Sequence, residues 1–125
     1  LDPRVALTAL QRAVAQRRPP PGLIVHSDRG VQYACSGFTQ WVVRHGFVQS
    51  MSRKGDCWDN AVAESFFHLL KTELTYHCHW LTYQAAHRSL FEYIEIFYNR
   101  ERSHSTLDYA TPDQFEQQQL STIAA

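Results

Sequence analysis

The order of hydrophobic and polar residues at the start of the chain predicts a helix followed by a strand. Residues 4–18 carry apolar side chains three and four positions apart, which is the spacing of one face of an α-helix. The proline-rich segment 19–22 ends this helix, because proline has no backbone N–H to donate. Residues 23–25 form a short apolar run after a turn, which is typical of a buried parallel strand.

A second helix and a second strand are predicted in the same way. Ser36 is a candidate N-cap for a helix over about residues 37–45, and Gly46 closes that helix. Residues 47–51 are the second strand candidate. Residues 29–35 are predicted to form a loop. Residues 52–58 are polar and contain a glycine, which predicts a mobile loop.

The second half of the chain predicts three helices. A long helix over about residues 60–77 begins at an Asp or Asn cap. Another begins at Thr82 and runs over about 82–100, and Thr111 caps the last one in front of a proline. We expect the tail, residues 121–125, to fray.

These elements occur in the order α-β-α-β-α-α-α, which indicates an α/β fold. Two short strands make a small sheet for a chain of 125 residues, so we expect further strands upstream to complete it. Leu1 leads within two residues into a helical pattern, without an initiator methionine. We therefore expect the chain to be the second part of a longer polypeptide.

Composition narrows the class of protein. The chain is 44% hydrophobic and 19% charged, which indicates a globular domain. Twelve basic residues balance twelve acidic ones, which argues against a purely electrostatic nucleic-acid binder but not against a DNA enzyme. Three cysteines without a paired spacing suit a reduced cytosolic protein, and the adjacent His77, Cys78 and His79 lack zinc-site spacing. No apolar run reaches the roughly 18 residues of a membrane span.

Two carboxylates are the main candidates for chemistry. Asp28 follows the first predicted strand, and the carboxyl ends of strands are where α/β sheets usually bind ligands. Glu64 shares one face of the predicted helix with Asn60, His68 and Lys71. Such an arrangement can hold a divalent metal ion against a phosphodiester. The alternative is a solvated helix face with no function, and periodicity alone favours that alternative.

The other side of the same helix is apolar. Val62, Phe66 and Leu69 lie opposite the polar stripe, and we expect this side to pack against the core.

Three stretches resemble one protein family. Residues 26–33, His-Ser-Asp-Arg-Gly-Val-Gln-Tyr, resemble the second catalytic Asp motif of the OrfB-type insertion-sequence transposases, which are DDE enzymes related to the retroviral integrase core. Residues 52–67, continued by 70–74, resemble the Glu motif of that group. Residues 98–115 are similar to its C-terminal signature. The 35 residues between Asp28 and Glu64 agree with the spacing of the family.

The resemblance implies a ribonuclease-H-like fold, in which helices flank a mixed sheet. It implies two Mg²⁺ or Mn²⁺ ions held by two Asp and one Glu, of which Asp28 and Glu64 would be present here as catalytic and metal-binding residues. Enzymes of this family nick DNA at transposon ends and join the freed 3′-hydroxyl to a new strand. One metal would activate the attacking oxygen and the other would stabilise the leaving oxygen.

The same resemblance implies DNA as the partner, both transposon ends and target, and a homo-oligomer on paired ends in the bacterial cytoplasm at the nucleoid. Lys71 would contact transposon-end DNA. From charge and position we add further DNA contacts in and beside the polar loop, namely Arg53, Lys54, Trp58 and Asn60.

The chain departs from the family pattern at its start. The first catalytic Asp is missing, and Asp2 cannot replace it because it begins a helix. The first three strands are also missing, so residues 1–120 would be the C-terminal part of a catalytic core. We expect this fragment to be inactive alone and to need an upstream transposase segment. Asp108 replaces the more usual Gly of the family, which should alter only a loop.

Two other functions stay open on the sequence. One is a non-catalytic module that binds DNA or co-assembles with a transposase, or a remnant of a transposase. The other is a metal-dependent host nuclease, which fits the long matched stretches less well.

Overall fold

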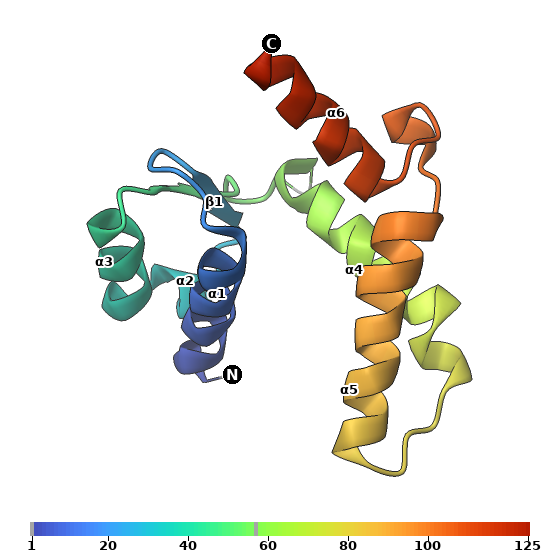
Figure 1. Cartoon of the computed structure of the whole chain (residues 1–125). Helices are drawn as coiled ribbons and strands as arrows, with labels where there is room; N and C mark the ends of the chain where they lie inside the picture. The colour runs from blue at the N-terminus through green and yellow to red at the C-terminus, as the bar shows by residue number, and fades with distance from the viewer. Residues whose placement is uncertain (1, 57) are drawn as a thin grey trace. The chain divides into compact units, whose positions relative to one another are not determined.

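The computed structural model describes residues 2–56 and 58–125, which form two compact units, Leu1–Ser65 and Phe66–Ala125 (Figure 1). Helices dominate both units. The elements, in chain order, are α1 (Pro3–Arg17), β1 (Ile24–Ser27), α2 (Val31–Ala34), α3 (Ser36–Arg44), β2 (Val48–Met51), η1 (Trp58–Asn60), α4 (Ala61–Glu73), η2 (Thr75–His77), α5 (Tyr83–Phe91), η3 (Glu92–Glu101), η4 (Ser105–Leu107) and α6 (Pro112–Ala124).

The N-terminal unit contains a two-stranded parallel sheet with α1, α2 and α3. β1 and β2 are in register from Ile24 opposite Val48 to Ser27 opposite Met51. Asp2 begins α1 as the sequence predicts, because its carboxylate accepts a hydrogen bond from the backbone N–H of Arg4 at 2.9 Å. The parallel pairing confirms the predicted α/β order of this unit.

The core of this unit lies between α3 and the start of β2. Phe38, Val42 and Phe47 are buried together, and side chains of α1 and β1 pack around them. Gly46 makes the turn between helix and strand at φ +72, in the left-handed region that favours glycine. This turn brings the N–H of Phe47 to the carbonyl of Val42 at 3.0 Å and so closes the core.

Three predictions for this unit are corrected. The strand at residues 23–25 was expected to be buried, but Ile24 is exposed and Val25 is half-buried, because two strands have no second layer to cover both faces. The predicted loop 29–35 contains the short helix α2. Ser36 is the first residue of α3, and the N-cap is Cys35, which makes no side-chain capping bond.

The sheet in the described residues is also smaller than a ribonuclease-H-like mixed sheet. Two parallel strands are paired, and a mixed sheet would need an antiparallel strand as well.

The C-terminal unit is helical. Thr82 caps α5 by accepting a hydrogen bond from the N–H of Ala85 at 3.1 Å, as predicted. α5 continues without a break into η3, a π-helix that ends at Glu101. Thr111 caps α6 in a reciprocal capping box with Gln114, where Thr111 Oγ1 accepts at 3.2 Å and Gln114 Oε1 accepts at 3.0 Å.

Aromatic rings and one ion pair join the helices of this unit. Tyr93 is buried, and the ring of Tyr98 packs edge-on against Phe66 at 5.1 Å between centroids. Glu73, the last residue of α4, accepts from the guanidinium of Arg102 at 2.8 Å and from the hydroxyl of Tyr93 at 2.7 Å. These contacts tie the end of α4 to η3 and the residues after it.

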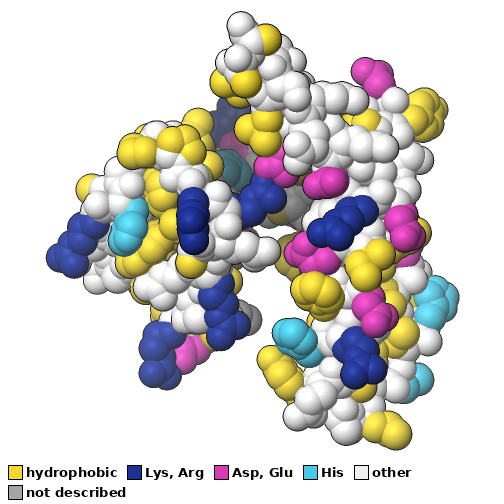
Figure 2. Space-filling model, in the orientation of Figure 1, with side chains coloured by type: hydrophobic (Ala, Val, Ile, Leu, Met, Phe, Trp, Pro, Cys, Tyr) yellow, Lys and Arg dark blue, Asp and Glu magenta, His cyan; other side chains and the backbone are white. Residues whose placement is uncertain are grey.

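The helix predicted over 60–77 is corrected at both ends. A 3-10 turn, η1, precedes α4, and α4 stops at Glu73 before a second 3-10 turn, η2. The predicted burial of its apolar side is met only in part: Val62 is 88% exposed, whereas Phe66 and Leu69 are half-buried. Hydrophobic side chains are likewise visible at the surface over α5 and α6 in Figure 2.

The end of the chain also differs from the prediction. α6 continues to Ala124, through most of the segment 121–125 that was expected to fray. Two hydroxyls support these last turns, because Ser121 donates to the carbonyl of Gln117 and Thr122 to that of Gln118, both at 2.9 Å. Asp108 has φ +52, a conformation that glycine adopts without strain, which agrees with the usual Gly of the family at this position.

Candidate active site

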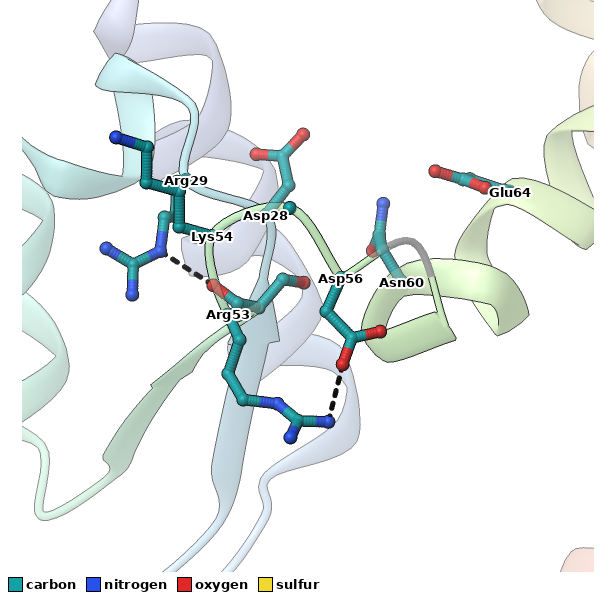
Figure 3. Close-up of a pocket in the computed structure, with 9 residues that line it drawn as sticks. Asp28, Arg29, Arg53, Lys54, Asp56, Asn60 and Glu64 are labelled. Carbon is teal, nitrogen blue, oxygen red and sulfur yellow. Dashed lines mark hydrogen bonds and ion pairs between the residues drawn. The ribbon is translucent and has the colours of Figure 1, made fainter.

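An open pocket of about 470 Å³ in the N-terminal unit collects most of the predicted site residues (Figure 3). Its walls come from the ends of β1 and β2, from the loop after β2, and from η1 and α4. The lining residues are Asp28, Arg29, Ser52, Arg53, Lys54, Gly55, Asp56, Asn60 and Glu64.

The parallel sheet explains why residues from the two strand ends meet. Asp28 directly follows β1 and Ser52 directly follows β2, and parallel strands end at the same edge of a sheet. The N–H of Ser52 donates to the carbonyl of Ser27 at 2.9 Å, which extends the pairing up to Asp28. Asp28 Oδ1 accepts from the N–H of Gly30 at 2.8 Å, so the carboxylate is oriented by its own loop.

A hydroxyl and imidazole network stiffens this edge. His26 Nδ1 lies 2.9 Å from the hydroxyl of Ser50, and His26 Nε2 lies 3.3 Å from the hydroxyl of Ser52. Ser52 is buried and Arg29 Nε donates to its carbonyl at 2.8 Å. The base of the pocket is therefore held by hydrogen bonds between residues of both strands.

Glu64 reaches the pocket from the first turn of α4. Its side chain is exposed, and Asn60 lies between Glu64 and Asp28 in Figure 3. Among the described residues, neither Glu64 nor Lys54 has a hydrogen-bond or ion-pair partner. The carboxylate of Glu64 is thus available to a ligand.

Arg53 and two acidic residues close the loop that leads from β2 to α4. Arg53 Nη2 lies 2.7 Å from Asp56 Oδ2 and 3.1 Å from Asp59 Oδ1, and Arg53 Nε lies 3.1 Å from Asp59 Oδ2. Asp59 also accepts from the backbone N–H of Arg53 at 2.8 Å. These hydrogen bonds lower the pKa of Asp59 to about 2, so it is ionised at neutral pH.

The structure brings together five of the seven residues predicted for the site: Asp28, Glu64, Asn60, Arg53 and Lys54. Trp58 is 81% exposed and lines a neighbouring pocket with residues 53–56. Lys71 is exposed on the part of α4 that belongs to the C-terminal unit. Arg29 also lines the pocket and was not singled out from the sequence, although its position next to Asp28 was a usable signal.

The donor chemistry of the pocket suits a hard divalent cation, but the donor number is small. Carboxylate oxygens such as those of Asp28 and Glu64 are ligands that Mg²⁺ and Mn²⁺ prefer. Asp56 lines the same pocket but is paired with Arg53. Among residues 2–56 and 58–125, no three His, Cys, Asp or Glu side chains converge as a complete site.

Comparison with known proteins identifies the family. Two family models, both described as integrase core domain, match residues 2–57 and 64–120. The chain is 43% identical to the transposase InsF for insertion sequence IS3fB of Escherichia coli K12. The aligned region is 118 residues long, which is 94% of the chain. The chain belongs to the insertion-sequence transposases with an integrase core.

A second relative of this family comes from a different bacterium. The transposase for insertion sequence element IS904 of Lactococcus lactis is 46% identical over 105 residues, which is 84% of the chain. The chain spans only 41% of the length of the InsF relative and 42% of the IS904 relative. No solved structure matches the chain. The mixed α/β structure with a small sheet agrees with an integrase core, and no helix of the described residues is long and apolar enough to cross a membrane.

Proposed function

We propose that this chain forms part of the active site of a transposase, in which Asp28 and Glu64 hold divalent metal at the DNA phosphodiester that is cut or joined. The observation that supports this most directly is the shared pocket. Asp28 and Glu64 are 35 residues apart in the sequence, yet they line one pocket together with Arg29 and Lys54. The family membership makes DNA the substrate class.

The residues of the pocket divide into anionic and cationic groups with separate tasks. Mg²⁺ or Mn²⁺, when bound, would polarise the phosphodiester and activate the attacking oxygen. Asp28 and Glu64 supply hard oxygen ligands for it, and the hydrogen bond from Gly30 keeps Asp28 oriented toward the pocket. Arg29 and Lys54 supply positive charge for the phosphate oxygens. Asn60, Trp58 and Lys71 are further DNA contacts in this proposal.

In this proposal the third carboxylate comes from an upstream transposase segment. Asp2, the one Asp or Glu before Asp28, caps α1 and is paired with the side chain of Arg4 at 2.7 Å, so it is used structurally. We propose that an upstream transposase segment supplies this carboxylate and the strands that would complete a ribonuclease-H-like sheet. The active form would then be an oligomer assembled on paired transposon ends.

Titration of the ¹⁵N-labelled chain with Mn²⁺ tests the metal site. We expect selective paramagnetic broadening of amides around Asp28 and Glu64, and we expect Asp28→Asn to abolish it. Asp113→Asn is the matched control, because Asp113 is an exposed Asp on α6. Diffuse broadening, or broadening that survives Asp28→Asn, would contradict the proposed site.

A strand-transfer assay separates this function from the second candidate, a non-catalytic DNA-binding or co-assembly module. Among the described residues no three potential metal-ligand side chains converge, which favours the second candidate for the chain taken alone. With pre-processed transposon ends and Mn²⁺, we expect no product from the 125-residue chain. We expect product when the upstream transposase segment is added, and loss of that product in Glu64→Gln. Failure to obtain product with the upstream segment present would favour the non-catalytic module.

A further inference from the structure

The loop between β2 and α4 carries two adjacent cations whose surroundings differ. Arg53 is bound to both Asp56 and Asp59, whereas Lys54 has no acidic partner among the described residues. In Figure 3 the side chain of Arg53 extends away from Asp28 to Asp56, while Arg29 and Lys54 extend to another side of the pocket. The charge of Arg53 alone suggested a DNA contact, and these contacts suggest a different role.

We propose that Arg53 is a positioning residue that ties the start of α4 to the end of β2 and so holds Glu64 at the pocket, while Lys54 and Arg29 supply the charge that meets phosphate. This inference rests on the proposed function for its substrate, DNA phosphate. The positioning part depends only on the contacts of the loop.

The contacts of Arg53 span the whole loop. Arg53 lies two residues after Met51, the last residue of β2, and Asp59 lies in η1, directly before α4. Glu64 follows Asp59 by five residues, which is about 7.5 Å along a helix axis. The backbone N–H and the guanidinium of Arg53 both bind Asp59, so the first turn of α4 has a fixed distance from the strand end.

Asp56 makes the loop a network rather than one ion pair. Asp56 Oδ2 binds Arg53, while Asp56 Oδ1 accepts from the backbone N–H of Trp58 at 3.1 Å. Gly55 has φ +78, so the chain turns between Arg53 and Asp56 in a conformation that suits glycine. The guanidinium fork therefore meets two carboxylates placed by the turn, an arrangement that the single ammonium of a lysine cannot reproduce.

The exposure of Arg53 limits how much its ion pairs contribute to the free energy of unfolding. The side chain of Arg53 is 75% exposed, and a single exposed ion pair contributes little to stability. A network that joins two backbone segments can still restrict how those segments move relative to each other. We therefore expect removal of Arg53 to loosen residues 59–64 locally and to leave the unfolding of the N-terminal unit nearly unchanged.

The charge of Arg53 is also neutralised by its ion pairs with Asp56 and Asp59. Its hydrogen bonds with Asp59 raise the pKa of Arg53 and lower that of Asp59, so both partners are charged and satisfy each other. A phosphate contact to Arg53 would compete with two carboxylates that already neutralise its charge. The Nε of Arg29 donates to a neutral carbonyl, that of Ser52, and Lys54 has no ion-pair partner among the described residues, so their charges are available to DNA.

Amide hydrogen exchange of the full 125-residue chain tests the positioning role without DNA or metal. We expect Arg53→Ala and Asp59→Asn each to speed exchange of amides 60–64 by about threefold. Arg53→Lys should give a smaller increase, and the matched control Lys54→Ala should give none. Unchanged exchange in both Arg53→Ala and Asp59→Asn would overturn the inference.

The Mn²⁺ titration adds a second readout, the paramagnetic broadening of amides near Glu64. This broadening depends on where Glu64 lies and not on how stable the loop is. With Mn²⁺ alone as the probe, we expect Arg53→Ala to weaken broadening around Glu64 and to leave broadening around Asp28 intact. Equal broadening at Glu64 in wild type and Arg53→Ala would count against a positioning role.

The salt dependence of DNA binding separates positioning from phosphate contact. We expect Lys54→Ala to reduce the slope of log K against log salt concentration by about one, because one counterion fewer is released. Arg53→Ala should keep the wild-type slope, and a slope that falls by about one in Arg53→Ala would refute the division of roles. If the wild-type chain neither binds DNA nor shows Mn²⁺ broadening, the proposed function fails, and hydrogen exchange still decides the role of Arg53.

Discussion

Replacing Glu73 by Gln tests the ion pair that joins α4 to the rest of the C-terminal unit. Glu73 Oε1 accepts from Arg102 Nη2 at 2.8 Å and Nε at 3.0 Å, and Glu73 Oε2 accepts from the hydroxyl of Tyr93 at 2.7 Å. Gln has nearly the same volume and keeps one acceptor. The substitution therefore removes the charge and at least one of these hydrogen bonds without opening a cavity.

The burial of the pair sets the magnitude. The side chains of Arg102 and Glu73 are 24% and 29% exposed, which places them between an exposed pair and a fully buried one. Exposed pairs contribute about 0–1 kcal/mol, and hydrogen bonds to charged groups contribute about 1.5–3 kcal/mol. We expect Glu73→Gln to lower the free energy of unfolding of this unit by about 2 kcal/mol.

The same contacts predict a dependence of stability on pH. The hydrogen bond from Arg102 lowers the pKa of Glu73 below its ordinary value of 4.5. A carboxylate with a lowered pKa stabilises the fold fully above its unfolded value, and this contribution is lost as pH falls through the folded pKa. Burial, followed by the charge of Arg102, lowers the pKa of His104 below 6.5, so protonation of His104 also favours the unfolded state as pH falls.

The two groups can be told apart by where stability is lost. Loss that begins below about pH 6.5 belongs to His104, and loss below about pH 4.5 belongs to Glu73. In Glu73→Gln only the second loss should disappear.

Urea unfolding followed through NMR signals of η3 is the suitable assay, because a chain of two units need not unfold in one step. Glu92→Gln is the matched control, since Glu92 is exposed on the same helix, and it should change stability by less than about 0.5 kcal/mol. Equal stability of Glu73→Gln and Glu92→Gln, or an unchanged loss below pH 4.5 in Glu73→Gln, would refute the reasoning.

Two further substitutions test the packing and capping of the separate units. Phe38→Ala should destabilise the N-terminal unit by about 3–5 kcal/mol, because Phe38 is only 2% exposed in the core between α3 and β2. Urea unfolding followed on α3 amides measures this change. A loss of stability below about 1 kcal/mol would contradict the packing of that core. Thr111→Ala should lower the stability of α6 by about 1 kcal/mol because it removes the N-cap, while Thr111→Ser should keep most of that stability. Amide exchange in the first turn of α6 measures both variants. Equal exchange in the two variants would count against the capping box.

Local signals in the sequence predicted the parts of the fold that depend on near neighbours. Thr82 and Thr111 both cap helices as predicted, because a capping bond involves residues only three positions apart. The turn at Gly46 and the parallel pairing of the two strands also agree with the prediction. The predicted end of the long helix was wrong, because α4 ends at Glu73 and a 3-10 turn follows at Thr75–His77. The bond between Glu73 and Arg102, 29 residues apart, has no local signal in the sequence.

The sequence predicted the residues of the candidate site but not all of their roles. The motif around Asp28 and Glu64 pointed to both carboxylates, and the structure places both at one pocket. The roles of the cations were not predictable from charge alone. Arg53 and Lys54 are adjacent in the sequence. In the part of the chain that the structure describes, Asp56 and Asp59 pair with Arg53 and not with Lys54.

Burial is less complete than predicted at the apolar faces of β1 and α4, and one physical cause accounts for both. An apolar pattern shows which side of an element suits an apolar neighbour, whereas burial requires that neighbour to be present. Ile24 is 65% exposed because a two-stranded sheet leaves a face uncovered, and Val62 on α4 is also exposed to solvent. Burial of apolar surface stabilises a fold by about 25 cal/mol per Å², so these faces forgo stability that a covering layer would provide. In the proposed function, upstream strands would enlarge the sheet on which the apolar side of α4 can pack and would carry the third carboxylate, so the stability of this chain and the completion of its site would depend on the same segment.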